Sequence, residues 1–263
     1  MYKTFRVKRR IRGSFVLLAV LLFAFGVCAI MSALTPASRL CANTDLISAQ
    51  EAGATIQDAL FKRVFLTFDD GPSVTTEKIL DILKAEGVHA SFFVVLSEEN
   101  EKRWDLTTRM EQEGHCIALH SASHKYSNIY STPSAFWDDI DLLKDRLQPY
   151  VQTEPMVLRF SGGSTNTVSH RYGGKSIMDT LKAEAVERGY TVIDWNVCAE
   201  DAVGGHPSSK AIYNNVVNSA KGKSTCMVLM HDTAATSNTA EALPDIIAWF
   251  KENDYVFCTV DEY

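Results

Sequence analysis

Two adjacent carboxylates, Asp69 and Asp70, are the first residues of this 263-residue chain whose types and spacing could do chemistry. They end an apolar run, residues 63–68, that indicates a buried strand, and Gly71-Pro72 marks a turn directly after them. Two neighbouring side chains at a strand end can point in different directions. One carboxylate could therefore bind a metal ion while the other faces a substrate. Taken alone, the same residues also fit a solvated turn.

A pair of histidines follows about fifty residues downstream. Residues 116–119 form a short, strand-like apolar run, and His120 and His124 come after it, four residues apart. If the chain makes a helical turn here, both imidazoles lie on one face, close enough to share an ion. A lone His-x-x-x-His is also often structural or incidental. Together with Asp70, however, it makes a His-His-Asp set that suits a catalytic zinc with a position open for water.

A third apolar run, residues 226–230, leads directly into His231. Three strand-like segments therefore each end in residues of metal-ligand or acid–base type. This is the pattern of an α/β barrel, in which the active site lies at the carboxyl ends of the strands.

The elements that would position these residues alternate along the chain. Seven strand-like runs alternating with six helical stretches predict an α/β fold with a parallel sheet and crossover helices. The predicted strands are residues 63–68, 90–95, 116–119, 156–160, 190–194, 226–230 and 255–260. The predicted helices are residues 75–86, 102–113, 134–150, 176–188, 208–220 and 239–253.

With these pieces in place, residues 61–263 resemble the NodB-type polysaccharide deacetylases, the family-4 carbohydrate esterases. The resemblance follows the order of the family's five motifs and implies a distorted, incomplete (β/α) barrel of about seven parallel strands. In the first motif it implies Asp69 as catalytic base and Asp70 as metal ligand. In the second motif it implies His120 and His124 as the other ligands. The implied metal is Zn²⁺, and the ligand set also accepts Co²⁺, Ni²⁺ or Mn²⁺.

The third motif resembles Arg159-Phe160-Ser161-Gly162-Gly163-Ser164. The resemblance implies that Arg159 holds the catalytic Asp. Many relatives carry Pro-Pro-Tyr after this Arg, whereas this chain has Phe-Ser-Gly, and by position the Gly162 N–H would bind the oxyanion. The Arg-Phe-x-Gly-Gly-Ser form is similar to a subgroup of bacterial cell-wall deacetylases. Taken alone, Arg159 would also fit a surface ion pair.

The last two motifs lie near Trp195 and His231. Asp194-Trp195-Asn196-Val197, running on to Asp201, is similar to the fourth motif and implies that Trp195 lines an acetyl pocket and Asp201 orients a histidine. Leu229-Met230-His231 matches the fifth and implies that Leu229 shapes the pocket and His231 is the general acid. By themselves, Trp195 and Leu229 would each fit the core.

The N-terminus carries a different signal. Six basic residues lie within residues 1–12, no charge occurs in residues 13–38, and the apolar stretch 15–34 is long enough to span a bilayer. We expect a cytoplasmic tail (1–12), a transmembrane signal anchor (13–34), a juxtamembrane linker (35–60) and an extracellular catalytic domain (61–263). The alternative is a cleaved signal peptide, which would make the domain secreted.

The charge balance restricts the partners. Removing the six N-terminal bases from 26 basic residues leaves 20 against 32 acidic ones, a formal charge of about −12. Such an acidic domain is a poor nucleic-acid binder, and a neutral or zwitterionic glycan is the more natural partner. Nothing in the sequence indicates an oligomeric state.

Three functional hypotheses follow. The first is a membrane-anchored, metal-dependent enzyme that removes N-acetyl groups from peptidoglycan. The second is a deacetylase of another glycan, such as a chitin oligomer, an exopolysaccharide or xylan. The third is a non-catalytic glycan-binding relative, against which the presence of both Asp69 and His231 argues.

Overall fold

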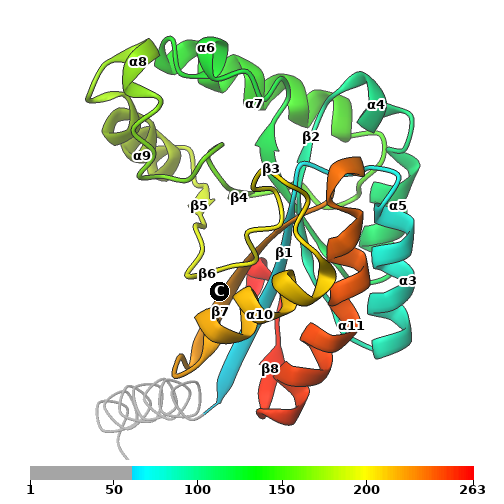
Figure 1. The fold of residues 1–263 in the computed structure, drawn as a ribbon. Helices are drawn as coiled ribbons and strands as arrows, with labels where there is room; N and C mark the ends of the chain where they lie inside the picture. Colours follow the sequence, from blue (N-terminus) through cyan, green and yellow to red (C-terminus); the bar gives the residue numbers. More distant parts are fainter. Residues whose placement is uncertain (1–60) are drawn as a thin grey trace, which may run out of the picture. The chain divides into compact units, whose positions relative to one another are not determined.

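Eight strands form one parallel sheet in the part of the chain that the computed structural model describes, residues 61–263 (Figure 1). The strands are β1 (Lys62–Asp69), β2 (Ser91–Val95), β3 (Cys116–Ser121), β4 (Val157–Leu158), β5 (Thr191–Val192), β6 (Val197–Cys198), β7 (Thr225–His231) and β8 (Tyr255–Phe257). The order is β5-β4-β3-β2-β1-β7-β6, and β8 pairs with the first residues of β1.

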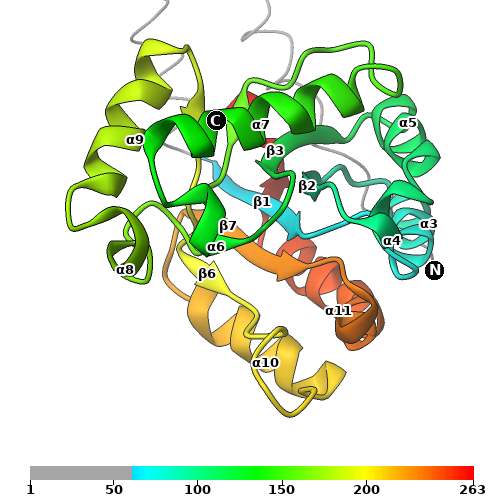
Figure 2. The same ribbon diagram turned by 90° about the horizontal axis from the view of Figure 1, so that it is seen from above.

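The sheet curls into a barrel that stays open between β5 and β6. These strands follow one another in sequence yet form the two ends of the strand order. Helices surround the curled sheet on its outside (Figure 2). They are α3 (Thr76–Glu86), α4 (Glu98–Glu101), α5 (Asp105–Gln112), α6 (Tyr126–Ile129), α7 (Pro133–Leu147), α8 (His170–Gly173), α9 (Ile177–Glu187), α10 (Ser209–Ala220) and α11 (Ser237–Glu252), with the 3₁₀ turns η1 (Ala234–Thr236) and η2 (Val260–Glu262). The predicted α/β class and incomplete barrel are confirmed.

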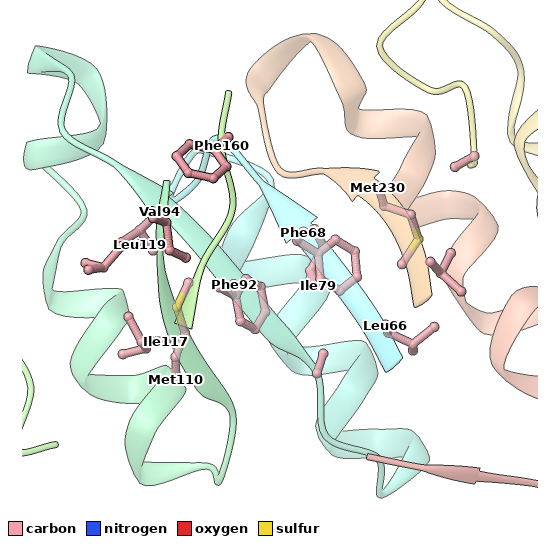
Figure 3. Packing of buried hydrophobic residues seen from close by; sticks show 14 of the residues in the cluster. Leu66, Phe68, Ile79, Phe92, Val94, Met110, Ile117, Leu119, Phe160 and Met230 are labelled. Atoms are coloured by element: carbon pink, nitrogen blue, oxygen red, sulfur yellow. The ribbon is translucent and has the colours of Figure 1, made fainter. Parts of the chain in front are cut away.

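Strand β1 shows how the sequence makes the two faces of the sheet. Side chains alternate along a strand, so Leu66 and Phe68 point outward into the large core beneath the helices (Figure 3). Phe65 belongs instead to a smaller cluster that includes Met227 and Val260. Because both faces of the strand are buried, its apolar run is nearly continuous. The polar residues at its end are therefore exceptions that need partners.

The strands near the barrel opening differ from the prediction. The predicted strand 190–194 is only Thr191–Val192, because the Arg159 guanidinium bonds the carbonyl oxygens of Ile193 (3.0 Å) and Asp194 (3.2 Å). Strand β6 was not predicted separately, and β4 is shorter than expected. The helix predicted over 102–113 corresponds to α5, and the short α4, which ends before residue 102, was not predicted.

The predicted tail, signal anchor and linker, residues 1–60, lie outside the described residues. Within residues 61–263, no helix has the length and apolarity to cross a membrane.

Candidate active site

Strands β1 and β7 place the first pair of predicted residues. They pair in parallel from Arg63 opposite Thr225 to Asp69 opposite His231, with Thr67 opposite Leu229. Because side chains alternate, these four residues lie on the same face of the two strands. That face is the inner one, since Asp69 and Thr67 both contact the buried Arg159 from there. Register alone thus brings the predicted base and the predicted acid to one edge of the sheet.

Asp69 and Arg159 form a buried ion pair. The Arg159 Nη1 atom donates to the Asp69 carboxylate at 2.7 Å, and the two side chains are only 5% and 0% exposed. The same Nη1 donates to the Thr67 hydroxyl at 2.8 Å. Burying a lone charge is very unfavourable, so each member of the pair requires the other. Asp69 is therefore held as a carboxylate with its second oxygen directed away from the arginine.

Aromatic rings complete the surroundings of Arg159. Its guanidinium carbon lies 4.0 Å from the centroid of the Phe93 ring and 5.7 Å from that of Trp195. Its remaining nitrogens bond backbone carbonyls after β5. The arginine therefore links β1, β2 and the chain after β5 across the inside of the barrel. A surface ion pair, the alternative that the sequence left open, does not fit this burial.

Asp70, His120 and His124 come together as the second cluster. Each offers one ligand atom, and these atoms all lie within 4.8 Å of one another. The Asp70 Oδ1 atom is 3.6 Å from the His120 Nε2 and 3.5 Å from the His124 Nε2. Two ligands about 2.0–2.1 Å from a tetrahedral ion lie roughly 3.4 Å apart, close to both distances.

The helical turn expected for the two histidines is wrong. His120 lies within β3, whereas His124 follows a bend beyond the strand end and has a left-handed φ of 50°. The rings still meet, with centroids 5.2 Å apart. The bend forms because the N–H groups of Ala122 and Ser123 donate to the Asp139 side chain instead of continuing a helix.

The donor atoms of this cluster fit a divalent metal ion. The Asp70 Oδ1 is buried and has no hydrogen-bond partner among the described residues, although a buried carboxylate oxygen needs a donor or a cation. The His120 Nδ1 lies 2.8 Å from the Arg159 carbonyl oxygen, which leaves its Nε2 to face the cluster. Burial lowers the pKa of His124 despite the nearby Asp70 carboxylate, favouring the neutral imidazole that binds metals. The residues suit Zn²⁺.

His231 is held by Asp201. The Asp201 carboxylate accepts from the His231 backbone N–H at 2.7 Å, lies 2.9 Å from its Nδ1, and also accepts from the Thr239 hydroxyl at 2.7 Å. Burial lowers the pKa of His231, but the hydrogen bond and charge of Asp201, with the charges of Asp69 and Asp70, raise it to about 9. The imidazolium is therefore favoured at neutral pH, with Nε2 free to donate.

The loop after β4 carries the third predicted motif. Gly162 has a φ of 80°, and a Cβ added there would lie 2.5 Å from the Tyr126 hydroxyl. Its N–H donates to no atom of the described residues. The Ser164 N–H donates to the Asp194 carboxylate at 2.9 Å, which ties the loop to the chain after β5. Only glycine fits this backbone and this close approach.

Trp195 and Leu229 occupy different places around the site. The Trp195 ring is half-buried beside Arg159, and a Cβ on Gly163 would approach it to 3.1 Å. Leu229 is buried in β7, two residues before His231 and on the same face. Both flank the site.

Two buried carboxylates at the site were missed from the sequence. Asp232 accepts from the hydroxyls of Thr76 (2.5 Å) and Ser73 (3.1 Å) and so fixes the turn after Asp70. Asp139 fixes the bend after His120. For Asp139 a signal existed, because it stands among the apolar residues that α7 buries.

A parallel barrel whose strand ends carry a base-type carboxylate, an acid-type histidine and a metal-ligand cluster defines a hydrolytic enzyme. The chain belongs to the polysaccharide deacetylase family: the model of the family described as "Polysaccharide deacetylase" matches residues 57–192. The predicted family and enzyme class, a hydrolase of the polysaccharide deacetylase type, are thereby confirmed.

Comparison with individual relatives supports the same family. The chain is 31% identical over 203 residues to a peptidoglycan-N-acetylglucosamine deacetylase of Bacillus cereus, covering 76% of this chain and 87% of that protein. It is similar to the crystal structure of the catalytic domain of peptidoglycan N-acetylglucosamine deacetylase from Eubacterium rectale, with 34% identity and a TM-score of 0.72 over 76% of this chain and 88% of that one. The Xyl-CE4 domain of a multidomain xylanase from the hindgut metagenome of Trinervitermes trinervoides is 27% identical, with a TM-score of 0.60 over 77% of this chain and 89% of that one.

Proposed function

We propose that this chain hydrolyses N-acetyl groups of a cell-wall glycan, peptidoglycan in the first place, with Zn²⁺ or a similar divalent ion bound by Asp70, His120 and His124. One observation carries the proposal. The buried Asp69–Arg159 pair, the three-ligand cluster and the Asp201–His231 pair all meet at one edge of the sheet. No two of these alone would suffice for amide hydrolysis, which needs a base, charge stabilisation and an acid.

Asp69 is the base in this proposal. A metal ion held by the three ligands would supply positive charge that polarises the acetyl carbonyl and lowers the pKa of a water molecule. The Asp69 oxygen not bonded to Arg159 lies 3.8 Å from the His120 Nε2, so it borders the ligand cluster. It accepts a proton from the attacking water, while Arg159 keeps the carboxylate charged and oriented.

The carbonyl oxygen gains negative charge as the water oxygen bonds to the carbonyl carbon. In this proposal the Gly162 N–H, unpaired among the described residues, donates to that oxygen, a contribution of roughly 3 kcal/mol. Trp195 and Leu229 form apolar walls near the acetyl methyl group. Tyr126 restricts the space beside Gly162.

His231 completes the reaction as the acid. When the C–N bond breaks, the leaving nitrogen takes a proton from the His231 Nε2, and the products are acetate and a free amine. Asp201 holds the ring through Nδ1 and favours its charged form. Asp69 then releases its proton to solvent and His231 takes one up from solvent, so both groups recover their starting state.

Peptidoglycan is the favoured substrate because two of the relatives described above are named as peptidoglycan N-acetylglucosamine deacetylases. The Arg-Phe-x-Gly-Gly-Ser motif, which is similar to that of a subgroup of bacterial cell-wall deacetylases, also favours peptidoglycan. Xylan and other acetylated glycans are the second candidate, which the similarity to the Xyl-CE4 domain favours.

The proposed location is the outer face of the cell membrane. The basic residues 1–12 and the uncharged segment after them support a single signal anchor with the domain outside. Cleavage of that segment would release the domain as a secreted enzyme. Sequencing the N-terminus of the protein recovered from cell membranes and from the medium separates the two.

The test is acetate release from purified peptidoglycan by the full-length chain in detergent, with and without a chelator. We expect release that stops with the chelator and returns when Zn²⁺ is added. Release from xylan or chitin oligomers, and not from peptidoglycan, would transfer the proposal to the second candidate. A folded, Zn²⁺-loaded chain that deacetylates no glycan of the panel would overturn the proposal and favour a glycan-binding role.

A further inference from the structure

Asp139 is a buried charge outside the groups that would meet the substrate. It lies on α7 among Phe136, Ile140 and Leu143, which face the core, and is only 6% exposed. Among the described residues, no Lys, Arg or His forms an ion pair with it. A carboxylate in such a place is strongly unfavourable unless hydrogen bonds compensate it.

The compensating bonds all come from the bend that joins the two histidine ligands. The Asp139 Oδ2 accepts from the Ser121 hydroxyl at 2.6 Å and from the Ala122 N–H at 2.7 Å. The Oδ1 accepts from the Ser123 N–H at 2.9 Å. One carboxylate thus binds three consecutive residues, so the bend cannot relax without leaving a buried charge unpaired.

Ser121 extends this hold to His124. Its hydroxyl oxygen accepts from the His124 N–H at 2.8 Å while its hydrogen is donated to Asp139. His124 has a φ of 50°, a conformation that non-glycine residues rarely adopt and that persists only where surrounding contacts enforce it. Asp139 is the origin of those contacts.

His120 does not depend on the bend in the same way. It belongs to β3, and its Nδ1 is 2.8 Å from the Arg159 carbonyl oxygen. The two histidine ligands are thus held by different means, His120 by the sheet and His124 by Asp139.

We propose that Asp139 is a positioning residue for the metal site: by fixing the Ser121–Ser123 bend it places the His124 imidazole opposite Asp70. The inference rests on the proposed metal site and adds a residue that touches neither metal nor substrate. Partners that orient metal ligands typically change metal affinity about 10- to 100-fold when they are removed. The Asp139→Asn variant keeps the size of the side chain but loses the charge and one acceptor.

The experiment measures the Zn²⁺ dissociation constant of the full-length chain in detergent, by competition with a chromophoric chelator. We expect Asp139→Asn to bind Zn²⁺ about 10- to 100-fold more weakly than the wild type. Asp138→Asn and Asp141→Asn, at exposed positions on the same helix, serve as matched controls and should bind like the wild type. Urea unfolding of the metal-free proteins measures any general loss of stability separately.

A double-mutant cycle isolates the route through His124. In a His124→Ala background, adding Asp139→Asn should weaken Zn²⁺ binding less than about twofold, because the ligand that Asp139 positions is already absent. An equal loss in both backgrounds would overturn the inference, since the effect would then be general. So would wild-type Zn²⁺ affinity in a folded Asp139→Asn chain, whatever its stability.

Ser121→Ala is the second variant if Asp139→Asn does not fold. It keeps the Asp139 bonds to Ala122 and Ser123 but removes the acceptor of the His124 N–H. We expect weaker Zn²⁺ binding, and unchanged binding would overturn the inference. A wild-type chain that binds no Zn²⁺ would overturn the metal site itself, which distinguishes failure of the proposed function from failure of the positioning role.

Discussion

Two halves of the site reach the same edge of the sheet by different means. Strands β1 and β7 form the first half, and the chain from β3 to β6 forms the second. The first half, called the regular half here, consists of strands of eight and seven residues that pair without interruption. In the second, the irregular half, β4, β5 and β6 have two residues each. Backbone pairing is enough to place Asp69 opposite His231, whereas side chains must take over the task in the irregular half.

In the irregular half, three side chains hold the backbone in place of strand pairing. Arg159 bonds the carbonyl oxygens after β5, Asp139 bonds the bend after β3, and Asn196 bonds the Thr225 carbonyl oxygen (2.9 Å) and the Met227 N–H (2.8 Å) beside β6. Two of them carry a charge that is buried. We therefore expect that His231 in the regular half can be replaced with little effect on the fold, whereas Arg159 and Asp139 in the irregular half support site and fold together.

The largest effect should come from His231→Asn in the regular half. Loss of a general acid lowers kcat by about 10²- to 10⁴-fold on an N-acetyl glycan, because the amine would leave unprotonated. An activated aryl acetate, whose leaving group needs no proton, should lose far less. Acetate release from both substrates and urea unfolding check this. Equal losses on both substrates would show that His231 is not the acid.

Arg159→Met should affect both site and fold. It leaves Asp69 buried without its cation, and removing one member of a buried pair lowers the free energy of unfolding by about 3–5 kcal/mol. Urea unfolding measures this. Arg188→Met is the matched control, since that exposed guanidinium lies over the Trp137 ring at 4.4 Å. Its loss should lower the free energy of unfolding by at most about 1 kcal/mol. A variant as stable as the wild type would contradict the structural role of Arg159.

Asp201→Asn should change how kcat depends on pH, because it alters His231 in the regular half. The acid must be protonated to act, and Asp201 contributes to raising the pKa of His231 to about 9. Losing that charge lowers the pKa, so the alkaline limb of the kcat–pH profile should move to lower pH by about one to two units. Glu200→Gln, at an exposed neighbouring position, should leave the profile unchanged. An unmoved alkaline limb would exclude His231 as the group it reports.

The smallest effect is expected for Asn196→Ala. Its two hydrogen bonds join the segment before β6 to β7, and their loss should lower the free energy of unfolding by about 1 kcal/mol. Asn214→Ala, at an exposed position of α10, should be neutral or slightly stabilising because alanine favours helix. A neutral Asn196→Ala would mean that pairing alone holds β6, and the contrast between the two halves would weaken.

The sequence predicted the regular half well, for a physical reason. Long apolar runs that end in Asp69-Asp70 and in His231 identify strands and their carboxyl ends together, and parallel pairing then brings those ends to one edge. The irregular half was predicted through family resemblance at Arg159 and Gly162. The strands predicted over 156–160 and 190–194 exist but have only two residues each, and β6 was not predicted. Strand β5 ends early because a side chain from another strand end takes the carbonyl oxygens after it.

The bend between the histidines was mispredicted for the same reason, because a side chain from another element bonds the backbone there. The spacing of His120 and His124 fits a helical turn, and local spacing cannot reveal that Asp139, distant in sequence, binds the N–H groups between them. A carboxylate on the buried face of a predicted helix was the available signal. It marks a place where the apolar pattern is interrupted to serve a site.

In the proposed mechanism two adjacent carboxylates have separate tasks, Asp69 as base and Asp70 as metal ligand. It is tested most directly by measuring Zn²⁺ affinity and acetate release from peptidoglycan on the same samples of Asp69→Asn and Asp70→Asn. We expect Asp69→Asn to bind Zn²⁺ like the wild type but to release acetate about 10²- to 10⁴-fold more slowly, whereas Asp70→Asn should lose both. Full acetate release by a folded Asp69→Asn chain would contradict it.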